Sequence, residues 1–120
     1  MPNGIHILIV EDDPLVAEVL QATLAMEYRT SRAKTLGEAR ALFRTSHFDL
    51  LLIDPILSDG RADEIIELAE AVDTRVVTMS GYPADTIGLE HCVHPHLEKP
   101  FGRDMLMGMI ERVLRSPVRK

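Results

Sequence analysis

Cysteine is nearly missing from this sequence, and long hydrophobic runs are missing altogether. The single cysteine, Cys92, excludes an internal disulfide, which is typical of a protein kept in a reducing cytoplasm. No apolar run approaches the roughly 20 residues that a membrane-spanning helix needs. The N-terminal residues also lack the basic segment, long apolar region and cleavage site of a signal peptide. We therefore expect a cytoplasmic location and no association with a membrane.

Positive charge is scarce as well. The 13 lysines and arginines are outnumbered by 19 aspartates and glutamates, which gives a net charge of −6. A nucleic-acid-binding domain would favour a basic face, so we expect no nucleic-acid partner for this domain. The sequence shows no repeat, low-complexity stretch or linker, and its length fits a single domain over residues 1–120. The basic tail, about residues 116–120, is predicted to be a frayed end after the last helix.

What the sequence does contain is a regular alternation of two patterns. Short apolar runs typical of buried strands alternate with segments whose apolar residues recur at helical spacing. The predicted strands cover residues 5–10, 28–33, 48–53, 75–79 and 93–98, and the second is polar enough for a sheet edge. Strict alternation predicts an α/β fold with a doubly wound, five-stranded parallel sheet and helices on both faces. In such folds the functional site lies outside the carboxyl ends of the strands.

Capping residues mark two of the predicted helix starts. Asp13 is a favourable cap, and Pro14 after it suits the first helical position. Thr35 and Glu38 have the spacing of a capping box, in which each side chain bonds the backbone amide of the other residue. Helices are therefore expected to begin at these two places.

Periodicity indicates which faces of the helices are apolar. The third and fourth helices are expected over residues 62–72 and 83–90, and the fourth is expected to be short or irregular. The methionines of the closing helix are predicted to belong to the core and the helix surface rather than to a soft-metal site. Apolar residues recur at helical spacing at Leu15, Val16, Val19, Leu20 and Leu24 in the first helix and at Met105, Leu106, Met109, Ile110, Val113 and Leu114 in the last.

Four of the predicted strands end in polar residues whose chemistries complement one another. Converging carboxylates repel by roughly 4 kcal/mol per pair at about 4 Å and an effective dielectric near 20, so either one of them is protonated or a hard cation lies between them, and Mg²⁺ fits. Asp54 is the natural nucleophile, because a carboxylate can form an aspartyl phosphate. A hydroxyl and an ammonium group nearby can bind phosphoryl oxygens. The polar ends are Glu11, Asp12 and Asp13 after the first strand, Asp54 after the third, Ser80 and Gly81 after the fourth, and Lys99 after the fifth.

These polar ends belong to four motifs that occur together, in this order, in one protein family. The motifs are Val10-Glu11-Asp12-Asp13-Pro14, Ile53-Asp54 with Leu57 and Asp59-Gly60 beyond it, Ser80-Gly81, and Lys99-Pro100-Phe101. With them, the chain resembles a response regulator receiver domain of two-component signalling over essentially its whole length. The resemblance implies a flavodoxin-like sheet with the strand order 2-1-3-4-5.

The resemblance also implies a metal site. Asp12 would bind Mg²⁺ or Mn²⁺ directly together with Asp54. Glu11 would act on the metal through water, and the backbone carbonyl of Ile56 would complete the site.

The phosphoryl group itself would be carried by Asp54. Ser80 and Lys99 would grip its oxygens, and Gly81 would leave room for it. The family takes the group from a histidine kinase or a histidine phosphotransfer protein. The domain would then be a phospho-acceptor, at most catalysing its own phosphorylation and dephosphorylation, that switches a surface for a downstream protein.

The sequence departs from the family at several positions. Pro55 follows the acceptor directly and removes a backbone amide donor there. Ser58 stands where the family often has Pro, and Ala62 where it often has Gly. The segment between residues 80 and 99 is short. His96 occupies the position of the family's switch aromatic residue, and an imidazole can change its charge near neutral pH.

Two other functions stay open on these residues. A receiver-fold interaction module that works without phosphorylation is favoured by Pro55, Ser58 and the short fourth-helix region. A small flavin- or nucleotide-binding domain of similar topology is disfavoured, because acids rather than a glycine-rich phosphate loop follow the first strand.

A zinc site near the last strand is a further alternative. The segment from His91 to His96 holds one cysteine and three histidines, which are ligands that suit Zn²⁺. The spacing is too compact for a closed site, however, and Pro95 interrupts it. A polar sheet margin is the favoured interpretation.

Overall fold

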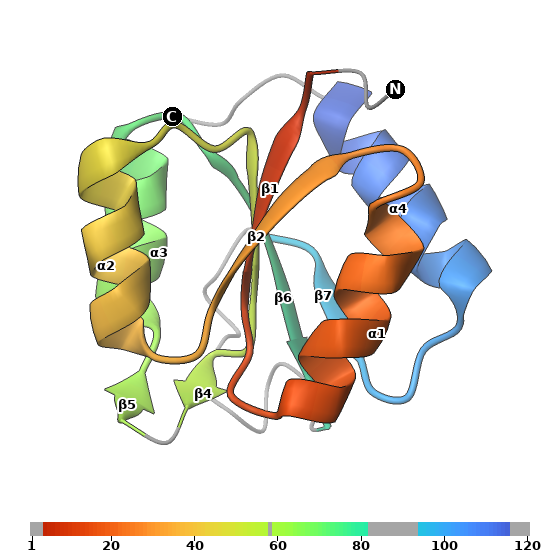
Figure 1. Cartoon of the computed structure of the whole chain (residues 1–120), viewed down its shortest axis with the longest axis horizontal. Coiled ribbons are helices and arrows are strands. Elements are labelled where there is room, and N and C mark those ends of the chain that lie inside the picture. Colours follow the sequence, from red (N-terminus) through yellow and green to blue (C-terminus); the bar gives the residue numbers. More distant parts are fainter. Residues whose placement is uncertain (1–3, 58, 82–93, 116–120) are drawn as a thin grey trace.

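The computed structural model of the chain, which describes residues 4–57, 59–81 and 94–115, is built around a five-stranded parallel sheet. Its spatial order is β2-β1-β3-β6-β7, the order 2-1-3-4-5 when the strands of this sheet alone are counted. The predicted doubly wound architecture and strand order are therefore confirmed (Figure 1). The strands are β1 (His6–Val10), β2 (Arg29–Ala33), β3 (Leu50–Ile53), β6 (Arg75–Ser80) and β7 (His96–Glu98).

Helices cover both faces of the sheet, as the alternating pattern predicted. Figure 1 shows α1 and α4 on one side of the strands and α2 and α3 on the other. The described helices are α1 (Pro14–Leu24), α2 (Leu36–Thr45), α3 (Asp63–Ala71) and α4 (Arg103–Arg115). None of these four has the length and hydrophobicity to cross a membrane. The predicted short helix at 83–90 and the tail at 116–120 lie outside the described residues.

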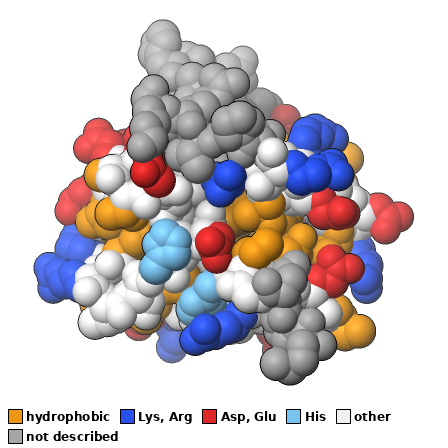
Figure 2. Space-filling model, turned by 90° about the horizontal axis from the view of Figure 1, so that it is seen from above, with side chains coloured by type: hydrophobic (Ala, Val, Ile, Leu, Met, Phe, Trp, Pro, Cys, Tyr) orange, Lys and Arg blue, Asp and Glu red, His pale blue; other side chains and the backbone are white. Residues whose placement is uncertain are grey.

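The edge where the strands begin carries a small polar group of its own. Figure 2 looks onto this edge and shows histidine side chains beside an acidic one near the middle. The backbone amide of His6 donates to Asp49 Oδ2 at 2.8 Å, and the ring Nε2 lies 2.8 Å from Ser31 Oγ. Burial lowers the pKa of the His6 imidazole below its ordinary 6.5, and the charge of Arg29 lowers it further, while Asp49 opposes both.

This histidine makes the fold sensitive to acid. Because folded His6 takes up its proton at a lower pH than unfolded His6, the unfolded state binds more protons below about pH 6.5, so its population rises. We expect His6→Gln to lose less unfolding free energy than wild type between about pH 7 and about pH 5.5, measured by urea denaturation. Arg44→Gln, an exposed change in the last turn of α2 that leaves every histidine in place, is the control and keeps the wild-type profile. Identical profiles for wild type and His6→Gln would contradict this account.

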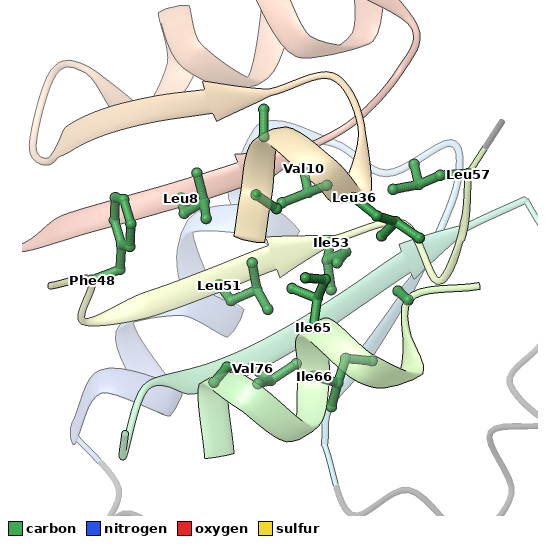
Figure 3. Close-up of a cluster of buried hydrophobic side chains, with 14 residues drawn as sticks. Leu8, Val10, Leu36, Phe48, Leu51, Ile53, Leu57, Ile65, Ile66 and Val76 are labelled. Atoms are coloured by element: carbon green, nitrogen blue, oxygen red, sulfur yellow. The ribbon is translucent and has the colours of Figure 1, made fainter. Parts of the chain in front are cut away.

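Two hydrophobic clusters, one on each face, enclose the sheet. Strands buried on both faces read as continuous apolar runs, as β1 and β3 do, because successive side chains point to opposite faces. Leu8 and Val10 of β1 pack with α2 and α3 (Figure 3), whereas Ile7 and Ile9 pack with α1 and α4. The sheet is therefore held between two cores, which fix the positions of the strand ends.

The predicted caps start α1 and α2. Asp13 Oδ1 accepts from the amide of Leu15 at 2.9 Å, and Pro14 is the first helical residue. Thr35 Oγ1 accepts from the amide of Glu38 at 3.1 Å. The Glu38 carboxylate, however, accepts from the amide of Lys34, one residue before the position of a standard capping box.

The structure corrects two expectations about element faces and ends. In α1, Leu15 and Val19 are 73% and 65% exposed, and the buried face is formed by Ala17, Leu20 and Leu24. The apolar pattern of this helix therefore covers more than its packed side. The last strand is shorter than predicted, since β7 begins only at His96.

A small hairpin follows the third strand and was not predicted. It consists of β4 (Ile56–Leu57) and β5 (Gly60–Arg61), which pair antiparallel. Gly60 has a φ of 136°, a value that side chains disfavour, which explains the glycine at this position. The Asp59 carboxylate accepts from the amide of Leu36 at 3.1 and 3.2 Å, so the hairpin is tied to the start of α2.

Candidate functional site

The carboxyl ends of four neighbouring strands meet at one edge of the sheet. Val10 of β1 pairs with Ile53 of β3, Ile53 pairs with Thr78 of β6, and Thr78 pairs with His96 of β7. This edge lies at the bottom of Figure 1, where α1 begins and the β4–β5 hairpin sits. The polar residues that follow these strands are therefore carried to the same place, as the sequence predicted.

The Lys99 side chain bridges two of the carboxylates there. Its Nζ lies 2.6 Å from Glu11 Oε1 and 3.2 Å from Asp54 Oδ2. These residues come from the ends of β7, β1 and β3, and 88 positions separate Lys99 from Glu11 in the chain. The Lys99 backbone is fixed as well, because its amide donates to the Ser80 carbonyl at 2.6 Å. The ammonium group is thus held between the two acids.

The three side chains of this bridge, those of Glu11, Asp54 and Lys99, are largely buried. The Glu11 side chain is only 1% exposed, that of Asp54 is 15% exposed, and that of Lys99 is 24% exposed. Burial alone lowers the pKa of Lys99, but its hydrogen bonds and its attraction to Glu11 and Asp54 outweigh burial and raise it above the ordinary value. Lys99 is consequently protonated at neutral pH and neutralises part of the acidic group.

Glu11 is fixed on its other sides by neighbouring backbone and by an arginine. Its Oε2 accepts from the amide of Asp13 at 3.2 Å. The guanidinium of Arg32 on β2 donates to the Glu11 carbonyl oxygen from Nη2 at 3.0 Å and from Nε at 3.3 Å. Sequence reasoning missed Arg32. The sequence feature that could have indicated it is a basic residue near the end of β2, the edge strand that pairs with β1.

The Asp54 carboxylate is oriented by the residue after the proline. Its Oδ1 accepts from the amide of Ile56 at 3.0 Å, and the amide of Asp54 donates to the Val10 carbonyl at 3.2 Å. Pro55 has no amide to offer, so Ile56 supplies the local donor. The other oxygen, Oδ2, accepts from Lys99 Nζ at 3.2 Å. The two carboxylate oxygens of Asp54 therefore have different partners.

Ser80, Gly81 and His96 lie at the ends of β6 and β7. Ser80 is buried, and its Oγ lies 3.3 Å from Nε2 of His96. Nδ1 of the same ring lies 2.7 Å from Thr78 Oγ1. Gly81 is exposed, and a Cβ placed on it would meet no atom of the described residues within 4 Å. Within that part of the chain, the glycine leaves space beside the serine.

The described residues offer oxygen donors for a metal ion but do not form a complete group of side-chain ligands. Asp12, half-buried, directly follows Glu11. Within residues 4–57, 59–81 and 94–115, no three carboxylate, histidine or cysteine side chains are grouped so that they could hold a metal ion. The available donors are nevertheless carboxylate and carbonyl oxygens, which Mg²⁺ prefers. The donor chemistry fits Mg²⁺, and Lys99 is the cation found between Glu11 and Asp54.

The two described histidines of the segment considered as a zinc site, His94 and His96, contact different partners. Nε2 of His94 lies 2.7 Å from Glu70 Oε2 on α3, whereas His96 contacts the two hydroxyls of β6. His91 and Cys92 lie outside the described residues. The described part of the segment gives no support to a zinc site.

Comparison with known proteins identifies the family of this arrangement. A model of the response regulator receiver domain family matches residues 7–111. The response regulator protein PilR of Pseudomonas aeruginosa is 32% identical over 114 residues, which are 90% of this chain and 26% of PilR. The probable transcriptional regulator ycf27 of Cyanidium caldarium is 27% identical over 92% of this chain and 46% of its own length. The chain therefore spans less than half of each of these two relatives.

Solved structures agree with this match. The non-phosphorylated HemR receiver domain of Leptospira biflexa superposes with a TM-score of 0.80 at 29% identity, covering 97% of this chain and 98% of the other. The receiver domain of the sensor histidine kinase PA1611 of Pseudomonas aeruginosa has a TM-score of 0.81 at 22% identity, covering 94% and 99%. That structure holds a magnesium ion coordinated in its active-site cleft.

Proposed function

The chain belongs to the response regulator receiver domain family, and from this premise we propose that Asp54 accepts a phosphoryl group in a Mg²⁺-dependent reaction. The observation that carries the proposal is the bridge from Lys99 to both Glu11 and Asp54. Phosphoryl transfer asks a protein mainly for positioning and for neutralisation of charge. A nucleophilic carboxylate beside a fixed ammonium, a buried hydroxyl and open space meets both demands.

In the proposed reaction an Asp54 carboxylate oxygen attacks the phosphorus of a phosphohistidine. A phosphorus–oxygen bond forms, the phosphorus–nitrogen bond breaks, and the donor imidazole leaves with the electron pair. The Lys99 ammonium and the Ser80 hydroxyl then bind phosphoryl oxygens, and the space beside Gly81 admits the group. Each named residue lies at the carboxyl edge of the sheet.

The metal would be held by side chains of the same edge. We assign direct binding of Mg²⁺ or Mn²⁺ to the carboxylates of Asp12 and Asp54 and to the Ile56 carbonyl, with Glu11 acting through water. When bound, the ion supplies positive charge to the phosphoryl oxygens. Asp54 is prepared for this by the amide of Ile56, which holds one of its oxygens.

The partners follow from the family. Receiver domains of two-component systems interact with histidine kinases and phosphotransfer proteins, and we propose such a protein as the donor. We place the reaction in the cytoplasm and assign no nucleic acid or membrane to this domain. The output is a change of the protein surface near β6 and β7 that a downstream protein reads.

Beryllofluoride with Mg²⁺ is the test, because it imitates a phosphoryl group on an aspartate. We expect shifts of the backbone amide signals of residues 11–13, 54, 56, 57 and 78–81 by NMR, since these surround the acceptor. Beryllofluoride with a chelator instead of Mg²⁺ is the control, for which the free spectrum is expected. An unchanged spectrum with Mg²⁺ present would contradict the proposal.

That negative result would favour a second function, a receiver-fold interaction module that works without phosphorylation. One observation favours this alternative, namely the way the loop after Asp54 is fixed. Pro55 and the β4–β5 hairpin follow the acceptor directly, and Asp59 ties the hairpin to α2. A loop already fixed in this way has less freedom to respond to a phosphoryl group.

A further inference from the structure

His96 lies beside the two hydroxyl side chains of the neighbouring strand. Thr78 pairs with His96, and Ser80 pairs with Glu98 two residues further along, so these side chains share one face of the sheet. Nδ1 of His96 lies 2.7 Å from Thr78 Oγ1, and Nε2 lies 3.3 Å from Ser80 Oγ. Each ring nitrogen is therefore within hydrogen-bond distance of a hydroxyl. One of these hydroxyls belongs to the residue that we assign to the phosphoryl group.

The hydrogens in this chain of contacts can be assigned. Thr78 Oγ1 lies 3.3 Å from the Pro95 carbonyl oxygen, which can only accept, so the threonine hydrogen points there. The oxygen of Thr78 then accepts from Nδ1–H of His96. In a neutral ring this leaves Nε2 without a hydrogen, and Nε2 accepts from the Ser80 hydroxyl. For a neutral ring, only this arrangement makes all three contacts hydrogen bonds.

A phosphoryl group on Asp54 competes for the same hydrogen. A serine hydroxyl has one hydrogen, and if Ser80 donates it to a phosphoryl oxygen, Nε2 of a neutral His96 faces the serine oxygen with no hydrogen between them. A protonated ring resolves the conflict, because its Nε2–H donates to Ser80 Oγ while Ser80 donates to the phosphoryl oxygen. The positive ring is also attracted by the phosphoryl charge.

We propose that His96 is a positioning residue that takes up a proton when Asp54 is phosphorylated and so releases the Ser80 hydroxyl hydrogen to the phosphoryl group. The inference rests on the proposed function of Asp54. Because the two events are linked, each favours the other to the same extent. Acid therefore stabilises the occupied site, and the occupied site stabilises the charged imidazole.

The charged groups around the ring bear on this proton. Glu98, two residues along β7 on the same face, favours a positive ring. Glu70 on α3 is already paired with His94 at 2.7 Å. Lys99 disfavours a positive ring, but its ammonium bridges the two carboxylates of the site. The phosphoryl group adds negative charge to this set, and we expect that addition to bring the proton onto His96.

Calorimetric titration with beryllofluoride and Mg²⁺ measures the linkage. Near neutral pH, the binding heat in two buffers of different ionisation enthalpy gives the number of protons taken up. We expect wild type to take up part of a proton and to bind more tightly as pH falls, by at most about tenfold per pH unit. His96→Phe, which keeps a ring but no hydrogen bonds, is expected to bind without this uptake and with a flatter pH profile.

Control variants separate the ring from its surroundings. His94→Gln removes the neighbouring histidine and should keep the wild-type uptake. If His96→Phe folds poorly, His96→Gln replaces it, since an amide keeps hydrogen bonds but cannot take up the proton. In ¹⁵N spectra of wild-type imidazoles without beryllofluoride at alkaline pH, we expect neutral His96 to carry its hydrogen on Nδ1.

Each contrary result has a distinct meaning. Equal proton uptake by wild type and the His96 variants would overturn the role of His96 while leaving Asp54 as acceptor. A neutral ring with its hydrogen on Nε2 would do the same. Failure of beryllofluoride to bind wild type at any pH would remove the proposed function, and the role of His96 with it.

Discussion

Asp54→Asn is expected to reduce phosphoryl incorporation to background. Acetyl phosphate with Mg²⁺ should add one phosphoryl group to wild type and none to the variant, as measured by the mass of the intact protein. The reason is chemical, since the carboxamide of asparagine does not form the acyl phosphate that a carboxylate forms. The substitution keeps the size of the side chain and an oxygen that can accept from the amide of Ile56. The fold is therefore expected to persist.

A matched control shows whether loss of any carboxylate, rather than loss of Asp54, reduces phosphoryl incorporation. Asp104→Asn makes the same change on an exposed residue in the first turn of α4. It should incorporate phosphoryl groups as wild type does. Undiminished incorporation in Asp54→Asn would remove Asp54 from the acceptor role, whereas equal losses in both variants would show that the position is not special.

Lys99→Met is expected to have the second large effect, on stability as well as on phosphorylation. It leaves the Glu11 carboxylate buried beside Asp54 without the ammonium. Removing one partner of a buried ion pair is strongly destabilising, because it leaves an uncompensated buried charge. We therefore expect Lys99→Met to lose about 3 kcal/mol of unfolding free energy at neutral pH, measured by urea denaturation without Mg²⁺. Added Mg²⁺ should recover part of the loss, because a bound cation replaces the missing charge and binds only the folded site. Phosphoryl incorporation should fall too.

Two further variants test the cause of that loss. Lys34→Met makes the same change at an exposed position and should alter stability little. Glu11→Gln combined with Lys99→Met removes the uncompensated charge, so the double variant should be more stable than Lys99→Met alone. A double variant no more stable than Lys99→Met would show that the buried charge is not responsible.

The parts of the fold that could be predicted are those set by local pattern. Strands buried on both faces must be apolar throughout, so β1 and β3 were visible as continuous runs. Alternation with helices then determined a parallel sheet, and chain direction placed all polar strand ends at one edge. For this reason Glu11, Asp54 and Lys99 could be expected at the same edge before their contacts were known.

The parts that could not be predicted depend on contacts between distant residues. Arg32 reaches the Glu11 carbonyl from β2, and nothing in its local sequence distinguishes it from a solvated arginine at a sheet edge. The apolar pattern of α1 includes the exposed Leu15 and Val19, and periodicity alone does not choose the packed face. The β4–β5 hairpin has only two residues in each strand, too few for an alternation pattern.

The same limit applies within the site. The sequence indicated an acid pair and a cationic residue, but it did not show that Lys99 lies between Glu11 and Asp54. Nor did it show that the ring of His96 connects two hydroxyls of β6. Both arrangements arise from strand register. It brings Lys99 into contact with Glu11, 88 positions away in the chain, and His96 into contact with Ser80, 16 positions away.

Chemical mapping of the phosphoryl group identifies the acceptor residue itself. Borohydride reduces an aspartyl phosphate to homoserine, so protein treated with acetyl phosphate and Mg²⁺ can be reduced, digested and sequenced by mass spectrometry. We expect homoserine at position 54 alone, and only when Mg²⁺ was present. Homoserine at another position, or none at position 54, would contradict this expectation.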